Sequence, residues 1–254
     1  MKQEKIIVIG GGVGPMAGVK LHEHIIQHTK TDGTDQDHLR VIHLSFSSYI
    51  PDRTAYLQGK TEINPAKEMF RVIEPIGQAL LSEELAIGIP CNTFHAPRIF
   101  DEFTSLIGTL PNTQVVHMIR ETATMIEQVI PGVRKIGLMS TSGTRTIGVY
   151  QQILEPMNYE VIQVPQDLQE ELHETIYDKQ WGIKAVFPVT QKARKRFEQY
   201  VQLLKAQQAE AVILGCTEIP LALPEKELFG IRLIDPMVAL ARSLVREANS
   251  DKLK

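Results

Sequence analysis

The sequence has few cysteines, little net charge and no long apolar run, and each scarcity excludes a class of protein. Its two cysteines, Cys91 and Cys216, are too few for a disulfide scaffold or for a structural zinc site with four cysteine ligands. No apolar run approaches the roughly 18 residues that cross a bilayer. The apolar run in the opening MKQEKIIVIGGG is too short for a signal peptide and indicates a buried strand. We therefore expect a cytoplasmic protein with reduced thiols and no membrane partner.

The balance of charge excludes a further class of partner. The chain carries 27 Lys and Arg against 30 Asp and Glu, a net charge of −3 at pH 7. It therefore lacks the basic footprint by which proteins bind nucleic acid. Hydrophobic residues at 43% and charged residues at 22% are typical of a globular protein. The 254 residues suffice for one large domain or for two of roughly 120 residues.

Short apolar runs alternate with longer helical patterns along the chain. Apolar spacing predicts helices over 117–130 and 236–248, among others. Several expected strands are apolar throughout, as strands buried on both faces of a sheet should be. The expected strands are 6–9, 40–44, 85–89, 114–117, 135–139, 159–164, 211–214 and 231–234. This alternation predicts an α/β fold with mostly parallel sheets flanked by helices.

The two halves of the chain show a weak repeat. IIVIGGGVG at 6–14 and KIGLMSTSGT at 135–144 both read as a strand followed by a turn of small residues, and AIGIPCNT at 86–93 resembles VILGCTE at 212–218. We therefore expect two pseudo-symmetric lobes, 1–116 with a returning 224–254, and 117–223. Ligands of open α/β sheets bind outside the carboxyl ends of strands, which predicts an active site in the crevice between the lobes. Closure about the crossing segments would exclude water from it.

The first turn of small residues fits a nucleotide-binding pattern only in part. Gly12, Gly14 and Ala17 match G-x-G-x-x-[G/A] after a strand and before a helix. The second strand, however, ends in Ser and Phe instead of the acidic residue that holds a ribose, and Pro15 removes a backbone N–H. The turn therefore suits a smaller anion, such as a carboxylate, better than a dinucleotide.

Each cysteine ends an apolar strand and is followed by polar residues. Cys91 lies in IPCNTFH and Cys216 in LGCTEIP. A free cysteine is most often a small buried hydrophobe, but two such arrangements, one in each half, favour a site. Two opposed thiols suit the inversion of an amino acid, because one must take the Cα proton from one face and the other must return a proton to the opposite face. Candidate groups for the α-carboxylate and the developing carbanion are the amides of the glycine turn, Asn92, Thr93 and Thr217.

With these motifs the sequence resembles the aspartate/glutamate racemase superfamily, most closely its aspartate racemases that work without pyridoxal phosphate (PLP). The resemblance covers nearly the whole chain. It rests on GGGVGPMAG at 10–18, PDRT at 51–54, NP at 64–65, PCNTFH at 90–95, GTxxxGxY at 143–150, IYxxxxGIK at 176–184 and LGCTEIPL at 214–221. It implies racemisation of a small acidic amino acid, aspartate before glutamate, with no cofactor and no metal. It also implies a homodimer.

The resemblance further implies a role for each matching residue. Cys91 and Cys216 would be the acid/base pair, with Cys216 serving the L face and Cys91 the D face. Arg53 and Lys184 would hold the side-chain carboxylate and so select acidic substrates. Glu218 would orient Cys216 or contact the substrate ammonium, and an N-cap role is its plainer alternative. The remaining expected substrate-binding residues are Gly12, Asn92, Thr93, Thr141 and Thr217.

Three departures from the family pattern fall on the side-chain pocket. Ile147 stands where a serine is usual, the run DKQW at 178–181 is uncommon before GIK, and the loop SSYIPDRT at 47–54 differs from commoner versions. These positions leave open whether aspartate or glutamate is preferred. They do not touch the two cysteines.

Other functions fit parts of the sequence. A maleate-type cis–trans isomerase or a hydantoin racemase would use the same fold with paired cysteines, whereas an arylmalonate decarboxylase keeps one. A sensor that binds an amino acid without turning it over belongs to a different class. Cys91 and His95 have the spacing of a thiol hydrolase dyad but lack a third member. His22, His24 and His28 share a helix, for which we expect a solvated or interfacial face and no metal.

Overall fold

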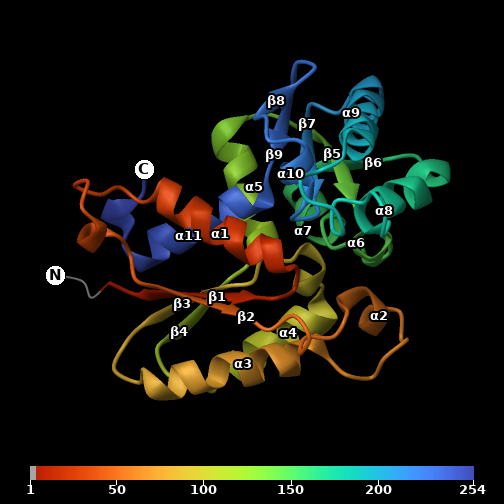
Figure 1. Cartoon of the computed structure of the whole chain (residues 1–254). Helices are drawn as coiled ribbons and strands as arrows, with labels where there is room; N and C mark the ends of the chain where they lie inside the picture. Colours follow the sequence, from red (N-terminus) through yellow and green to blue (C-terminus); the bar gives the residue numbers. More distant parts are fainter. Residues whose placement is uncertain (1–3) are drawn as a thin grey trace. The chain divides into compact units, whose positions relative to one another are not determined.

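The computed structural model describes residues 4–254, which form two compact units (Figure 1). The first unit comprises Met1–Glu121 and Met237–Lys254, and the second comprises Thr122–Pro236. Each unit is built on its own sheet. Within residues 4–254, no helix has both the length and the apolar character that a membrane crossing requires.

The first unit has a four-stranded parallel sheet in the order β2-β1-β3-β4. All six residues of the central strand β1 are buried, as its apolar run predicts. Helices α1 and α11 cover one face of this sheet, and α3 and α4 cover the other (Figure 1). Its elements are β1 (Ile6–Gly11), α1 (Pro15–His28), β2 (Val41–Ser45), α2 (Arg53–Leu57), α3 (Pro65–Ala79), β3 (Leu85–Gly88), η2 (Asn92–His95), α4 (Pro97–Ile107), β4 (Thr113–Val116) and α11 (Pro236–Ala248).

The second unit has a five-stranded sheet in the order β6-β5-β7-β9-β8, parallel except for β8. Its core includes the buried side chains of Phe197, Tyr200 and Val201 on α9, packed with Val212 of β7. Its elements are α5 (Met118–Val129), β5 (Lys135–Ser140), α6 (Ser142–Ile147), α7 (Gln151–Leu154), β6 (Glu160–Gln163), α8 (Gln169–Tyr177), α9 (Gln191–Ala206), β7 (Ala211–Gly215), α10 (Ile219–Ala222), β8 (Glu227–Leu228) and β9 (Ile231–Ile234).

The two sheets repeat one topology. The order β2-β1-β3-β4 of the first sheet corresponds strand for strand to β6-β5-β7-β9 of the second. The sequence repeat therefore reflects a repeat of structure. The helices that follow β4 and β9 belong mainly to the unit built on the other sheet. Most of α5, which follows β4, belongs to the second unit, and all of α11 except its first residue belongs to the first unit.

All eight expected strands form, each within two residues of its expected ends, and the α/β class with parallel sheets is confirmed. The observed division of the chain differs from the expected boundaries of 116/117 and 223/224. The chain crosses after Glu121 and again after Pro236. Residues 224–236 lie in the second unit because β9 pairs in parallel with β7, from Ala211↔Arg232 to Ile213↔Ile234.

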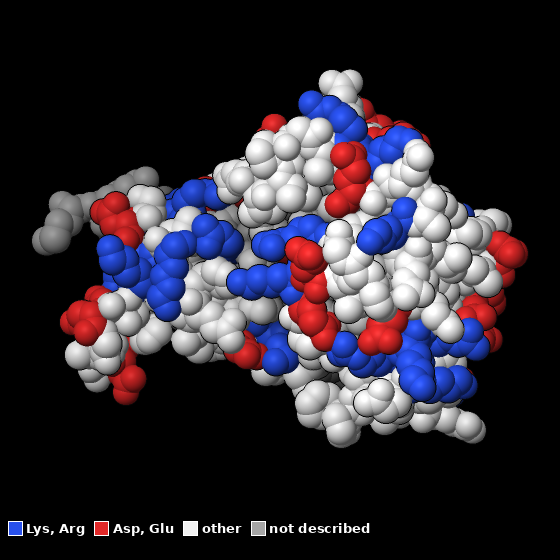
Figure 2. All heavy atoms as spheres, turned by 90° about the horizontal axis from the view of Figure 1, so that it is seen from above, with Lys and Arg blue, Asp and Glu red and all other residues white. Residues whose placement is uncertain are grey.

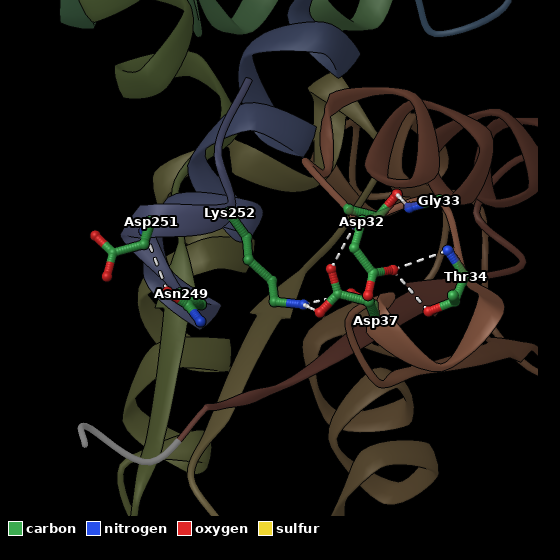
Figure 3. Close-up of polar contacts among 8 residues, drawn as sticks. Asp32, Gly33, Thr34, Asp37, Asn249, Asp251 and Lys252 are labelled. Atoms are coloured by element: carbon green, nitrogen blue, oxygen red, sulfur yellow. Dashed lines mark hydrogen bonds and ion pairs between the residues drawn. The ribbon is translucent and has the colours of Figure 1, made fainter.

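The C-terminal segment is fastened to the loop that follows α1 (Figure 3). Lys252 Nζ lies 2.6 Å from the Oδ1 atom of Asp37. The other carboxylate oxygen of Asp37 accepts a hydrogen bond from the backbone N–H of Asp32 at 2.9 Å. An antiparallel bridge joins Thr29 to Leu253 beside this ion pair. The end of the returning chain is thereby held to the loop after α1.

Charged side chains are spread over the surface shown in Figure 2, where basic and acidic groups are interspersed. The mixture agrees with the net charge of −3.

Candidate functional site

The ten expected site residues fall into two sets of five, one in each unit. In both sets the cysteine and the residues beside it follow a strand of a parallel sheet, which is where such sheets bind ligands, while Arg53 begins α2 and Lys184 lies between α8 and α9. The first set is Gly12, Arg53, Cys91, Asn92 and Thr93, and the second is Thr141, Lys184, Cys216, Thr217 and Glu218.

The glycine turn of the first set lies between β1 and α1. Gly12 has φ +85°, and a Cβ there would lie 2.5 Å from the backbone nitrogen of Phe46, just after β2. Only glycine therefore fits this close approach. Pro15 occupies the first turn of α1, where its missing N–H costs no helical hydrogen bond.

Arg53 fastens this turn. Its guanidinium donates to the backbone carbonyl oxygens of Val13 and Pro51, the latter at 3.2 Å. Asp52 caps α2 by accepting from the N–H of Ala55, which places Arg53 at the first residue of the helix. The PDRT motif thus positions an arginine against the glycine turn.

Cys91 follows β3, the neighbour of β1 in the first sheet. Its side chain and those of Asn92 and Thr93 are buried. The short helix η2 that begins at Asn92 packs against α2, the helix that carries Arg53. The first set of residues therefore lies at the carboxyl end of the first sheet.

His95 holds the Cys91 backbone. Its Nδ1–H donates to the carbonyl oxygen of Cys91 at 2.9 Å, and its ring stacks on Phe100 at 4.8 Å. Burial lowers the pKa of His95 to about 4, and burial, with the neighbouring His95 and Arg120, lowers the pKa of His117 to about 3. Both rings are therefore neutral at pH 7. Because the imidazole bonds the Cys91 carbonyl and not its sulfur, this geometry disfavours the thiol hydrolase alternative.

In the second set, Cys216 follows β7 directly. Gly215 and Ser140 are paired in the sheet, so Cys216 and Thr141 leave neighbouring strands side by side. The Thr141 hydroxyl caps α6 by accepting from the N–H of Thr144 at 3.3 Å. Cys216 is 6% exposed.

Glu218 joins the polar side chains of the second set. Its Oε2 accepts from Cys216 Sγ at 3.2 Å and from the Thr217 hydroxyl at 3.0 Å, while its Oε1 lies 2.5 Å from Lys184 Nζ. Glu218 is the N-cap residue of α10, but its side chain makes no capping hydrogen bond. The N-cap alternative is therefore wrong, and the carboxylate instead bonds the thiol, a hydroxyl and an ammonium group.

The electrostatics of this cluster follow from burial and from the ion pair. Burial, helped by the Glu218 carboxylate, raises the pKa of the Cys216 thiol. Burial would also raise the pKa of Glu218, but Lys184 and the hydrogen bonds from Cys216 and Thr217 lower it overall. Burial would lower the pKa of Lys184, yet the charges of Glu218 and Cys216 outweigh it and raise that pKa. Glu218 and Lys184 are thus charged, and Cys216 is a thiol.

Two tyrosines near this cluster were not predicted as site residues. Lys184 Nζ lies 5.5 Å from the ring centre of Tyr177, an arrangement that favours the cation. Burial, with the charges of Asp235 and Cys216, raises the pKa of the fully buried Tyr150. Both tyrosines are present in the motifs GTxxxGxY and IYxxxxGIK, which are the signal that could have identified them.

The histidines of α1 take part in local contacts. His28 Nδ1–H donates to the carbonyl oxygen of His24 at 2.8 Å, and the His22 ring meets that of His43 edge-on at 6.0 Å. Throughout residues 4–254, no three His, Cys, Asp or Glu side chains are grouped to hold a metal ion.

Comparisons with known proteins show the family and the fold of the chain. A family model described as Asp/Glu/hydantoin racemase matches residues 11–244. The solved structure of an aspartate racemase from Picrophilus torridus is 28% identical, with 96% of this chain and 94% of that chain covered and a TM-score of 0.77.

Two further solved structures share the fold. An aspartate racemase homologue from Pyrococcus horikoshii is 23% identical over 97% of this chain and 99% of its own, with a TM-score of 0.70. A glutamate racemase from Francisella tularensis, solved with D-glutamate, is 19% identical over 99% and 83%, with a TM-score of 0.62. The family match spans most of the chain and includes both cysteine turns and the strands listed above from β2 onward, whereas only the last residue of β1 falls within it. The chain therefore belongs to the Asp/Glu/hydantoin racemase family and is an amino acid racemase, an isomerase.

Proposed function

We propose that this racemase inverts acidic amino acids, aspartate ahead of glutamate, with Cys91 and Cys216 as its two acid/base groups. One observation carries the proposal: each cysteine follows the equivalent strand, β3 or β7, of two sheets with the same strand order. A duplicated fold thus supplies one thiol from each half. Both thiols are buried among polar side chains, as acid/base groups that work away from bulk water should be.

The proposed reaction moves two protons. A thiolate at one cysteine takes the Cα proton, and the electron pair remains on the substrate as a carbanion. The thiol at the other cysteine then delivers its proton to the opposite face. Because a thiol and a thiolate exchange these roles, the scheme requires neither PLP nor a metal.

Recognition of the substrate would use the remaining expected site residues. The glycine turn at Gly12, together with Asn92 and Thr93, offers hydrogen-bond donors for the α-carboxylate. Arg53 and Lys184 would select a second carboxylate on the side chain. Lys184 already holds the Glu218 carboxylate at 2.5 Å, which supports its affinity for such a group. A substrate carboxylate would have to compete with Glu218 for it.

Thr141 and Thr217 have local roles in this structure. The Thr141 hydroxyl caps α6, and the Thr217 hydroxyl donates to Glu218. We propose that their remaining hydrogen-bonding capacity faces the substrate. Size-exclusion chromatography with light scattering would test the homodimer that the sequence leads us to expect, and fractionation of cells would test its cytoplasmic location.

The deciding experiment is proton NMR of the protein with L-aspartate, and separately with L-glutamate, in heavy water. Loss of the α-proton signal, together with loss of optical activity, would establish racemisation, and the faster substrate would be the preferred one. The protein should be treated with hydroxylamine and a chelator beforehand, since activity that survives shows independence from PLP and metal.

Other outcomes point to the alternatives. Exchange of neither amino acid, with turnover of maleate or of a substituted hydantoin, would replace the proposal by an isomerase or hydantoin racemase. Binding of an amino acid without exchange of its α-proton would indicate a sensor. A double variant with both cysteines replaced by alanine is the matched control, because it should bind substrate without exchanging its proton.

A further inference from the structure

The Glu218 carboxylate is nearly enclosed and yet fully bonded. Its side chain is 5% exposed, and its two oxygens bond Lys184, Cys216 and Thr217. A buried carboxylate is costly unless it is paired and hydrogen-bonded. The chain therefore keeps an ionised carboxylate beside the sulfur of Cys216, although a neutral side chain at this position would avoid the free-energy cost of burying a charge.

The hydrogen bonds define where the protons lie. A carboxylate that is ionised can only accept, and the nearby ammonium of Lys184 keeps Glu218 ionised. The sulfur that lies 3.2 Å from its Oε2 must then be the donor, so Cys216 carries its proton. The Thr217 hydroxyl must likewise donate to the same oxygen.

We infer that Glu218 is a positioning residue that keeps Cys216 protonated, so that this thiol enters the reaction as the proton donor. The inference rests on the proposed function and assigns the starting role of each cysteine. Cys91 is then the thiolate that breaks the Cα–H bond of the enantiomer whose α-proton it faces. The electron pair stays on Cα until the S–H bond of Cys216 breaks and its proton forms the new C–H bond.

The same geometry favours a return to the starting state. After one turnover Cys216 is a thiolate beside the carboxylate of Glu218, and Cys91 holds the proton taken from the substrate. Two anions so close repel each other, which favours reprotonation of Cys216. Lys184 moderates this repulsion, so the thiolate remains accessible for the reverse reaction.

Apart from Lys184, the other titratable groups near Cys216 do not favour ionisation of its thiol. Tyr150 and Asp235 belong to the second unit, and Tyr150 is a neutral phenol whose pKa is raised by burial, by Asp235 and by Cys216. Tyr177 faces Lys184 through its ring. Lys184 is therefore the one cation among these named groups, and its charge is shared with Glu218.

A titration of the thiol tests the inference without relying on turnover. Cys91→Ala leaves Cys216 as the one cysteine, and the ultraviolet absorbance of its thiolate can be followed against pH. The variant lacking both cysteines supplies the tyrosine background. In Cys91→Ala we expect ionisation only at alkaline pH. Adding Glu218→Gln should lower the midpoint by about one to three pH units, because it removes an anion and leaves Lys184 beside the sulfur.

Matched variants separate charge from structure. Glu218→Asp keeps the charge and should keep the midpoint alkaline, and Glu170→Gln removes an exposed carboxylate of α8 and should leave it unchanged. If Glu218→Gln does not fold, the infrared S–H stretch of Cys91→Ala serves instead. That band should be present at neutral pH and displaced from that of a free thiol by its hydrogen bond. Its absence, or a midpoint that Glu218→Gln leaves unchanged or raises, would overturn the inference.

The pH profile of racemisation provides a second readout. In Glu218→Gln the alkaline limb of activity should move to lower pH by the same amount as the thiol midpoint. A role that is only structural would lower activity at every pH without moving the limb. Failure of the wild-type protein to exchange the α-proton would refute the proposed function, whereas a limb that does not move would refute the role of Glu218.

Discussion

The two cysteines occupy corresponding places in sheets of one topology, but their surroundings differ in charge. At Cys91 the supporting side chain is the neutral imidazole of His95, which bonds the backbone carbonyl. At Cys216 it is the ionised carboxylate of Glu218, which bonds the sulfur itself and is paired with Lys184. The comparison teaches that the duplication repeats the framework and not the acid–base environment.

This asymmetry is useful for a reaction with two thiols. At any moment one thiol must be ionised and the other protonated, and two identical environments would not decide between them. The carboxylate beside the Cys216 sulfur decides where the proton lies. In the proposed mechanism the second unit therefore determines which cysteine is protonated, while the first unit supplies the glycine turn that Arg53 holds.

The largest expected effect comes from removing either thiol. Cys91→Ala and Cys216→Ala should each lower racemisation by about 10²–10⁴-fold or more, because each removes a positioned acid or base. The rate is measured by circular dichroism, starting from each enantiomer in turn. The variants Cys91→Ser and Cys216→Ser are the conservative controls. Near wild-type turnover in either alanine variant would show that a single base suffices.

The next effect tests the ion pair that distinguishes the second cysteine. Lys184→Met should destabilise the protein by about 3 kcal/mol, because it leaves the Glu218 carboxylate buried without its cation. Urea unfolding followed by fluorescence and circular dichroism measures the loss. Combining Lys184→Met with Glu218→Gln should recover part of it. If the double variant is as unstable as Lys184→Met alone, the pair is not coupled.

These contacts show where prediction from the sequence ends. The strands were predictable because strands buried on both faces need continuous apolar runs, and both cysteines were found because each ends such a run. The contact of Lys184 with Glu218 joins residues 34 positions apart, and that of Arg53 with Val13 joins residues 40 apart. Such contacts depend on how strands and helices pack, which local patterns do not encode.

The boundary after Pro236 illustrates the same limit. The helix pattern at 236–248 was visible, since apolar residues recur on one stripe. Whether the preceding strand pairs with the first or the second sheet depends on the parallel partner of β7, which lies far away in the sequence. The two-residue strand β8 is too short to leave any pattern.

A third prediction concerns the stability of the protein at acidic pH, which should depend on His95, the side chain that bonds the Cys91 carbonyl. The pKa of His95 falls to about 4 on folding, so between pH 6.5 and 4 the unfolded chain binds more protons than the folded one. The stability contributed by neutral His95 is therefore complete above pH 6.5 and decreases as pH falls toward 4. We expect a loss of about 2 kcal/mol between pH 7 and pH 5.

Urea unfolding at a series of pH values measures this loss. His95→Asn keeps an N–H near the carbonyl of Cys91 but cannot titrate, so its stability should depend less on pH in this range. His117, whose pKa is also lowered, should leave a residual slope. An unchanged pH dependence in His95→Asn would place the acid sensitivity elsewhere.

The smallest expected effect comes from exchanging the cationic side chains of Arg53 and Lys184. Arg53 bonds two backbone carbonyl oxygens with one planar guanidinium, whereas Lys184 makes one short contact with a carboxylate. Arg53→Lys keeps the charge but cannot span both carbonyls, so the glycine turn should loosen. We expect KM for the acidic substrate to rise about tenfold, or about 1.4 kcal/mol, with a smaller change in kcat. Lys184→Arg is the matched exchange in the other unit, and its larger guanidinium should displace the Glu218 carboxylate from Cys216 and alter kcat more than KM. The opposite split would mean that Arg53, and not the cluster at Glu218, governs the proton transfer.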